Sequence, residues 1–201
     1  MANTDRPAGL KPVKNLMGSP WNGKANVYYI PSTDDTATFI GDLVNLAGSA
    51  DDTGMYPTVT QAAAGDTDNV GVIIGFGKDP SLMADPDNLS MKYRLASVEM
   101  YCLVVDDPFV IFEVQEDSDG DAYIAATSVG LAANVVVGSG STTTGKSGME
   151  LDSSDVSTNT AGQLRILRAV NRPDNALGIH CKWEVLIAEH VYREQVTVVD
   201  V

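Results

Sequence analysis

Alternation of apolar and polar residues with a period of two most limits what this chain can fold into. The clearest example covers residues 180–187, where polar and charged residues alternate with the apolar series Cys181, Trp183, Val185 and Ile187. Successive side chains of a β-strand point to opposite faces of a sheet, so this pattern predicts a strand with one buried face.

Further strands are predicted where short apolar runs lie between turn-forming residues. These runs cover residues 26–30, 39–46, 70–76, 98–105, 109–116 and 163–170. Turns are predicted at 106–108, at Asp119-Gly120 and at 171–175, and residues 77–92 read as a long loop. The best helix candidate, residues 125–134, is short and contains Gly130, so it should form a turn or two at most.

These elements predict an all-β fold with little helix, in which residues 25–201 form a single β-barrel, tulip-like or sandwich domain. Residues 1–24 contain Pro7, Pro12 and Pro20, which favour an extended path and do not allow a regular helix. We therefore predict an extended N-terminal arm over residues 1–24. The two cysteines, Cys102 and Cys181, lie within apolar alternation and are predicted to be buried thiols.

The net charge of −14 argues against a nucleic-acid partner, because phosphate binding needs a concentrated basic surface. The arm differs from the rest: four basic residues against Asp5 give residues 1–24 a charge of +3 and leave −17 for the remainder. A basic arm on an acidic body could bind an acidic protein surface, and a solvated tail is the alternative. No apolar run approaches the ~18 residues that span a membrane, so no membrane partner is expected.

The most specific motif is GSTTTGKS, residues 140–147, which matches the P-loop pattern. A P-loop needs a following helix whose N-terminus binds phosphate, but Gly148 and a stretch of poor helix formers follow here. The alternation of strands and helices in P-loop folds is also missing. We predict a polar hairpin loop, with a nucleotide hydrolase that uses Lys146 as the less favoured alternative.

No other stretch predicts a catalytic, cofactor or metal site. The carboxylate-rich residues 116–121 fail the EF-hand pattern, which would require Gly and Glu where the chain has Ala122 and Ser128. A solvated β-turn is the favoured interpretation, and a weak loop-type calcium site is the alternative. His180 and Cys181 are adjacent and should point to opposite faces of a strand, which argues against a Cys–His nucleophile.

Several stretches follow one another in a recognisable order along nearly the whole chain, with gaps at 47–70 and 77–97. They are residues 9–13, 27–30, 106–117, 129–134, 148–152, 163–165, 171–175 and 185–190. In this order they resemble a family of small structural proteins of tailed phages, the capsid decoration or cement proteins. The resemblance implies a β-barrel or tulip-like fold, a homotrimer, and binding to the major capsid protein at three-fold positions of an HK97-type capsid.

The resemblance also implies that the protein is not an enzyme and has no catalytic residues. We expect a subunit that is assembled in the host cytoplasm, lies on the capsid exterior of the virion and stabilises the expanded head. The arm residues expected to contact the capsid are Arg6, Lys11, Lys14, Trp21 and Lys24. A tail-tube or other tail protein is the main alternative, and a secreted adhesin or carbohydrate-binding module is a further one.

Overall fold

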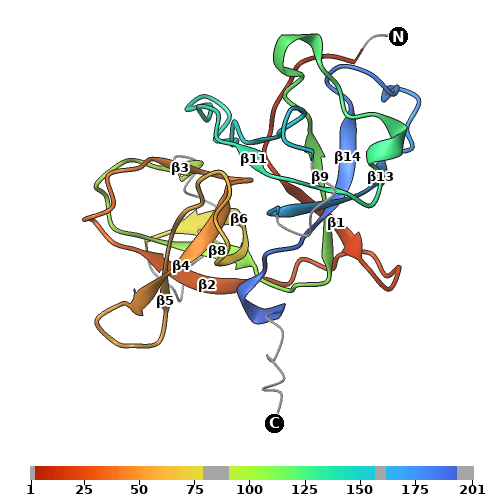
Figure 1. Cartoon of the computed structure of the whole chain (residues 1–201). Coiled ribbons are helices and arrows are strands. Elements are labelled where there is room, and N and C mark those ends of the chain that lie inside the picture. The colour runs from red at the N-terminus through yellow and green to blue at the C-terminus, as the bar shows by residue number, and fades with distance from the viewer. Residues whose placement is uncertain (1–2, 79–90, 157–161, 194–201) are drawn as a thin grey trace.

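The computed structural model describes residues 3–78, 91–156 and 162–193. Its regular elements are short strands and single-turn 3-10 helices, so the all-β prediction is confirmed. Figure 1 shows two β-units side by side, a closed barrel and a five-stranded sheet. Within the described ranges, no helix is long and apolar enough to cross a membrane.

The barrel is built from five strands in the order β2-β5-β4-β6-β8. Their bounds are β2 (Asn26–Ile30), β4 (Leu43–Ala50), β5 (Pro57–Gln61), β6 (Asn69–Gly77) and β8 (Met100–Val105). β2 closes the barrel by pairing antiparallel with β8 and parallel with β5. Alternate side chains such as Ile30, Cys102 and Val104 fill the interior and are fully buried.

The second unit is an antiparallel sheet in the order β1-β9-β14-β13-β10. Its strands are β1 (Lys11–Asn15), β9 (Val110–Gln115), β10 (Ala132–Ala133), β13 (Leu164–Ala169) and β14 (Lys182–Ile187). The series predicted from alternation is buried, because Trp183 and Val185 of β14 face the core with Phe112 of β9. Lys182 and Glu184 lie on the opposite face.

The two units share a core. Leu43, Val72 and Val105 lie on the outer wall of the barrel and pack in the same cluster as the inner face of the five-stranded sheet. Two small ribbons complete the structure, β3 (Thr38–Phe39) with β7 (Tyr93–Arg94) and β11 (Val135–Val136) with β12 (Glu150–Leu151). The 3-10 turns are η2 (Asp119–Asp121), η3 (Ala126–Ser128) and η4 (Val191–Arg193).

The structure divides the chain differently from the prediction of one barrel over residues 25–201. The barrel ends at Val105, and the later strands belong to the second sheet or its ribbon. The predicted arm is extended, and residues 11–15 within it pair with β9 as the edge strand β1 of that sheet. The predicted helix at 125–134 is the single turn η3 followed by β10. Most of the predicted loop at 77–92 lies outside the described residues.

Candidate functional site

The GSTTTGKS segment folds as a tight loop fixed to the strand region around Ile40. Ser141 N donates to Lys146 O at 2.8 Å, Ile40 N donates to Gly145 O at 2.9 Å, and Ser147 N donates to Ile40 O at 2.8 Å. Gly140 lies so close to the ring of Phe39 that a Cβ atom would overlap it. The short strand β12 follows and no helix begins there, so this segment lacks the phosphate-binding geometry of a P-loop.

The carboxylate-rich stretch at 116–121 also has a structural role. The Glu116 side chain is buried and accepts hydrogen bonds from Ile124 N and Trp183 Nε1, and Asp117 accepts one from the Ser153 hydroxyl. Across the described ranges, no group of three or more His, Cys, Asp or Glu residues is arranged to hold a metal ion.

The two cysteines are free, buried thiols, as predicted. Burial raises the pKa of the Cys102 thiol, and it raises that of Cys181 to about 11. A thiol with a raised pKa stays protonated at neutral pH and is a poor nucleophile. Neither cysteine is therefore a candidate catalytic residue.

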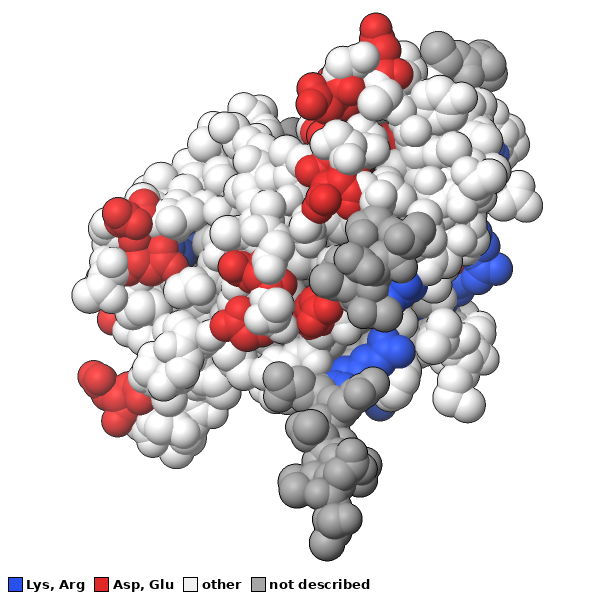
Figure 2. Space-filling view, viewed as in Figure 1, with Lys and Arg blue, Asp and Glu red and all other residues white. Residues whose placement is uncertain are grey.

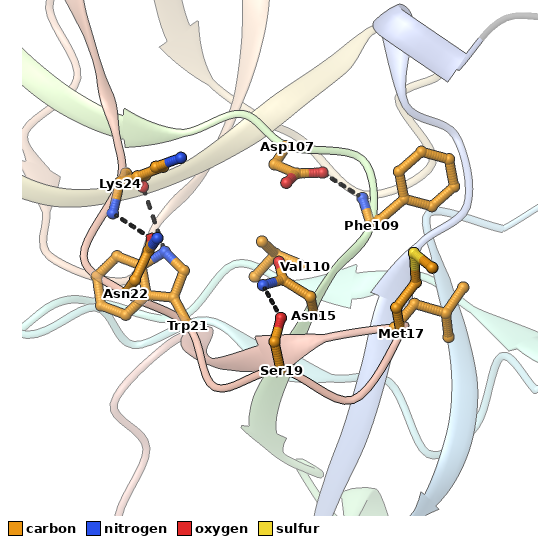
Figure 3. Close-up of a pocket in the computed structure, with 10 residues that line it drawn as sticks. Asn15, Met17, Ser19, Trp21, Asn22, Lys24, Asp107, Phe109 and Val110 are labelled. Atoms are coloured by element: carbon orange, nitrogen blue, oxygen red, sulfur yellow. Dashed lines mark hydrogen bonds between the residues drawn. The ribbon is translucent and has the colours of Figure 1, made fainter.

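The clearest candidate for function is a groove between the turn after β1 and the loop before β9, which we call the hairpin groove. Its volume is about 460 Å³. The lining residues are Asn15, Leu16, Met17, Ser19, Trp21, Asn22, Lys24, Asp107, Phe109 and Val110. Figure 3 shows Trp21, Asn22 and Lys24 on one side, Phe109 and Met17 on the other, and Asn15 and Val110 between them.

Local hydrogen bonds shape the turn that forms one wall of the groove. Asn15 N donates to Ser19 O at 2.8 Å, and Gly18 N donates to Asn15 O at 2.8 Å. Gly18 has a φ of +93°, a backbone conformation that residues other than glycine rarely adopt. Further along, the indole Nε1 of Trp21 donates to Lys24 O at 3.2 Å. The wall is thus fixed by its own backbone, while its apolar side chains stay exposed.

The apolar side chains of the groove are unusually open to solvent. Met17 is 97% exposed, Phe109 49% and Leu16 46%. The guanidinium of Arg193 lies 5.7 Å from the centre of the Phe109 ring, on the rim of the same surface. Single exposed apolar residues are common on proteins, but a cluster around a groove indicates a contact surface.

Of the five predicted contact residues, three lie in or beside the hairpin groove and two lie away from it. Trp21 and Lys24 line the hairpin groove. Lys14 lies in β1 beside it, and its Nζ is 2.7 Å from Glu184 Oε1. Lys11, at the start of β1, and Arg6 are exposed but do not line the groove, and Arg6 N donates to Gln115 Oε1 at 3.1 Å.

Sequence reasoning missed Leu16, Met17 and Phe109, which give the groove its apolar character. A signal was present for two of them, since Leu16-Met17 directly precede the turn-forming Gly18-Ser19-Pro20. An apolar pair at the tip of a turn has no sheet neighbour to cover it.

Family models, curated proteins and solved structures give no match to this chain. The site is therefore interpreted from its own geometry, an apolar groove with Lys14 and Lys24 close by. That arrangement fits binding of a protein surface better than chemistry on a substrate.

Proposed function

We propose that this chain is a non-enzymatic structural subunit that binds the surface of a larger protein assembly, as a decoration protein on the head of a tailed phage. The observation that carries the proposal is the hairpin groove, with Met17 almost fully exposed beside it. A soluble protein gains nothing in stability from such a side chain, whereas a binding surface uses it as an anchor.

In this proposal an apolar side chain of the major capsid protein enters the hairpin groove and packs against Trp21, Met17 and Phe109. Lys24 then meets an acidic group of the capsid protein at the edge of the apolar contact. An apolar centre with a charged rim is the usual anatomy of a protein interface. Many identical weak contacts on one shell would add through multivalency, so each groove can be small.

The ordered resemblance to cement proteins supports the choice of a phage head as the assembly. Among the described residues, both cysteines are buried, no group of three or more His, Cys, Asp or Glu residues is arranged to hold a metal ion, and the P-loop-like segment is followed by a strand instead of a helix. The work of such a decoration subunit would be mechanical. It would bridge capsid subunits after the shell expands and help the shell to resist the pressure of packaged DNA.

The proposal is tested by co-sedimentation of the purified protein with undecorated shells of its own phage, expanded and unexpanded in parallel. We expect saturable binding to expanded shells. Met17→Asp should weaken that binding by about tenfold or more, because it places a charge in the apolar contact. Met55→Asp is the matched control, since Met55 is 72% exposed and lies in the β4–β5 turn outside the groove.

Equal binding by the Met17→Asp and parent proteins would remove the groove from the proposal. Absence of binding to either shell, with the protein instead present in purified tails, would overturn the head assignment and favour a tail component.

A further inference from the structure

The outward face of the five-stranded sheet is basic, although the chain as a whole is acidic. The strand register places Arg168 opposite Glu184, Lys11 opposite Glu113, and Lys182 opposite Gln115, all on the face away from the core. The outward basic side chains are Lys11, Lys14, Arg165, Arg168 and Lys182, and the outward acidic ones are Glu113 and Glu184. This surface, the basic face, thus has a net charge of +3 on a chain of net charge −14.

The acidic side chains on the basic face are already neutralised. Glu184 is 2.7 Å from both Lys14 Nζ and Arg168 Nε, and Glu113 accepts two hydrogen bonds from Arg172. The Arg168 side chain is nevertheless 60% exposed. Figure 2 shows Lys and Arg gathered in the part of the molecule that contains β1, and Asp and Glu over the barrel and the upper edge.

The barrel carries a surface with the opposite character. The Tyr101 ring lies 5.3 Å from that of Tyr29 and 5.4 Å from that of Tyr56, and all three rings are partly exposed. Burial raises the pKa of Tyr29, and the exposed carboxylates of Glu99 and Asp52, which lie beside the rings, raise it further. We call these five residues the tyrosine–carboxylate patch. Tyrosine is enriched in protein interfaces and its ring attracts arginine.

The two surfaces cannot meet within one chain. Figure 1 shows β5 and the β4–β5 turn at the end of the molecule away from the five-stranded sheet. We propose that the basic face of one copy binds the tyrosine–carboxylate patch of a second copy. Arginine and lysine side chains of the face would lie over the tyrosine rings and pair with Asp52 and Glu99.

Each copy carries one basic face and one patch, so the contact is heterologous. A heterologous contact forms a closed ring when its rotation closes and a filament when it does not. The inference goes beyond shell binding, because the contact needs only copies of this chain. It leaves the hairpin groove free for another partner.

The test is sedimentation velocity of the full chain without shells, over a concentration series at low and high salt. We expect assemblies that grow with concentration and dissociate at high salt, where attraction between exposed charges is screened. Arg168→Glu on the basic face and Glu99→Gln on the patch should each weaken assembly by about tenfold or more. Lys182→Glu is a second face variant, should Arg168→Glu disturb folding beside Glu184.

A mixture of the face variant and the patch variant gives the sharpest result. Each variant keeps one intact surface, so a heterologous contact predicts a one-to-one dimer from two proteins that are monomeric alone. Lys146→Glu is the control outside both surfaces, and it should assemble as the parent does. A parent protein that stays monomeric at every concentration and salt would overturn the proposal, as would variants that assemble normally or a mixture without the dimer.

Discussion

The indole Nε1 of Trp183 donates a 3.0 Å hydrogen bond to Oε2 of Glu116, and both side chains are buried. The same oxygen accepts the backbone N–H of Ile124 at 2.9 Å. Burial raises the pKa of Glu116, although these hydrogen bonds oppose the shift. One carboxyl group therefore connects β14, the end of β9 and the loop after η2 inside the core.

Replacement of Glu116 should separate the value of these hydrogen bonds from the cost of burying a carboxyl group. Glu116→Ala leaves two buried donors without a partner, and we expect it to lower the free energy of unfolding by about 3 kcal/mol. Glu116→Gln keeps an acceptor oxygen and removes the charge, so we expect a change within about 1 kcal/mol. Chemical denaturation followed by circular dichroism measures both, and equal losses for Gln and Ala would contradict this role.

Arg94 should be one of the residues most sensitive to substitution. Its guanidinium is fully buried, lies 3.5 Å from the Asp34 carboxylate, and donates to four backbone carbonyls at 2.6–2.8 Å. Those carbonyls belong to Pro31, Asp34, Thr36 and Val98. Arg94→Lys keeps the charge but loses the planar fork, and we expect it to cost about 3 kcal/mol or more in unfolding free energy. The exposed Lys92→Gln is the control and should have no measurable effect.

The strands predicted from alternation and from short apolar runs overlap the observed strands, except that the turn at Gly41 divides the predicted strand at 39–46 into β3 and the start of β4. β1 was missed because it is an edge strand that places Lys11 and Lys14 outward, and an edge tolerates Pro12, which has no N–H. β5 was missed because its sequence, PTVTQ, is mostly polar even though Thr58 and Val59 are buried.

The division into two units could not be predicted from the same patterns. In β8, Val104 lines the barrel interior while the adjacent Val105 joins the core shared with the second sheet. A strand buried on both faces gives a continuous apolar run, which does not say what covers each face. The candidate site could likewise be predicted only in part. Trp21 and Lys24 were predicted from the arm, but Phe109 was predicted to be a strand residue. Its exposure depends on how its neighbours pack, which the sequence pattern does not show.

The GSTTTGKS loop should respond to substitution as a structural loop does. Gly145 has a φ of +73°, and a Cβ atom there would overlap the carbonyl oxygen of Lys92. Gly145→Ala should therefore lower the melting temperature by several degrees, roughly 1–3 kcal/mol of stability, whereas Lys146→Ala should leave it unchanged. Titration with Mg-ATP, followed by calorimetry, should show no binding to either variant or to the parent. Binding that Lys146→Ala abolishes would contradict the loop assignment.

Two groups should titrate with opposite effects on stability. His190 is buried and burial lowers its pKa from 6.5 to about 4, so the folded protein keeps it neutral. The unfolded chain binds its proton first, and stability should fall as pH drops from 6.5 towards 4, by at most about 3 kcal/mol. Burial and the carboxylates of Asp5 and Asp117 raise the pKa of Glu150 from 4.5 to about 7. The folded protein therefore holds this proton more tightly than the unfolded chain, and the contribution of Glu150 to the free energy of unfolding falls as pH rises from 4.5 to 7.

The two windows overlap, so their contributions should partly cancel in the parent protein, and single substitutions should separate them. Relative to the parent, Glu150→Gln should make stability rise more steeply with pH between 4.5 and 6.5, because only the His190 contribution remains. His190→Gln should make the slope less positive, and the double variant should lie between the two. The measurement is the free energy of unfolding by denaturant at several pH values across that range. Because other carboxylates titrate equally in every variant, a His190→Gln slope equal to that of the parent would refute the assignment.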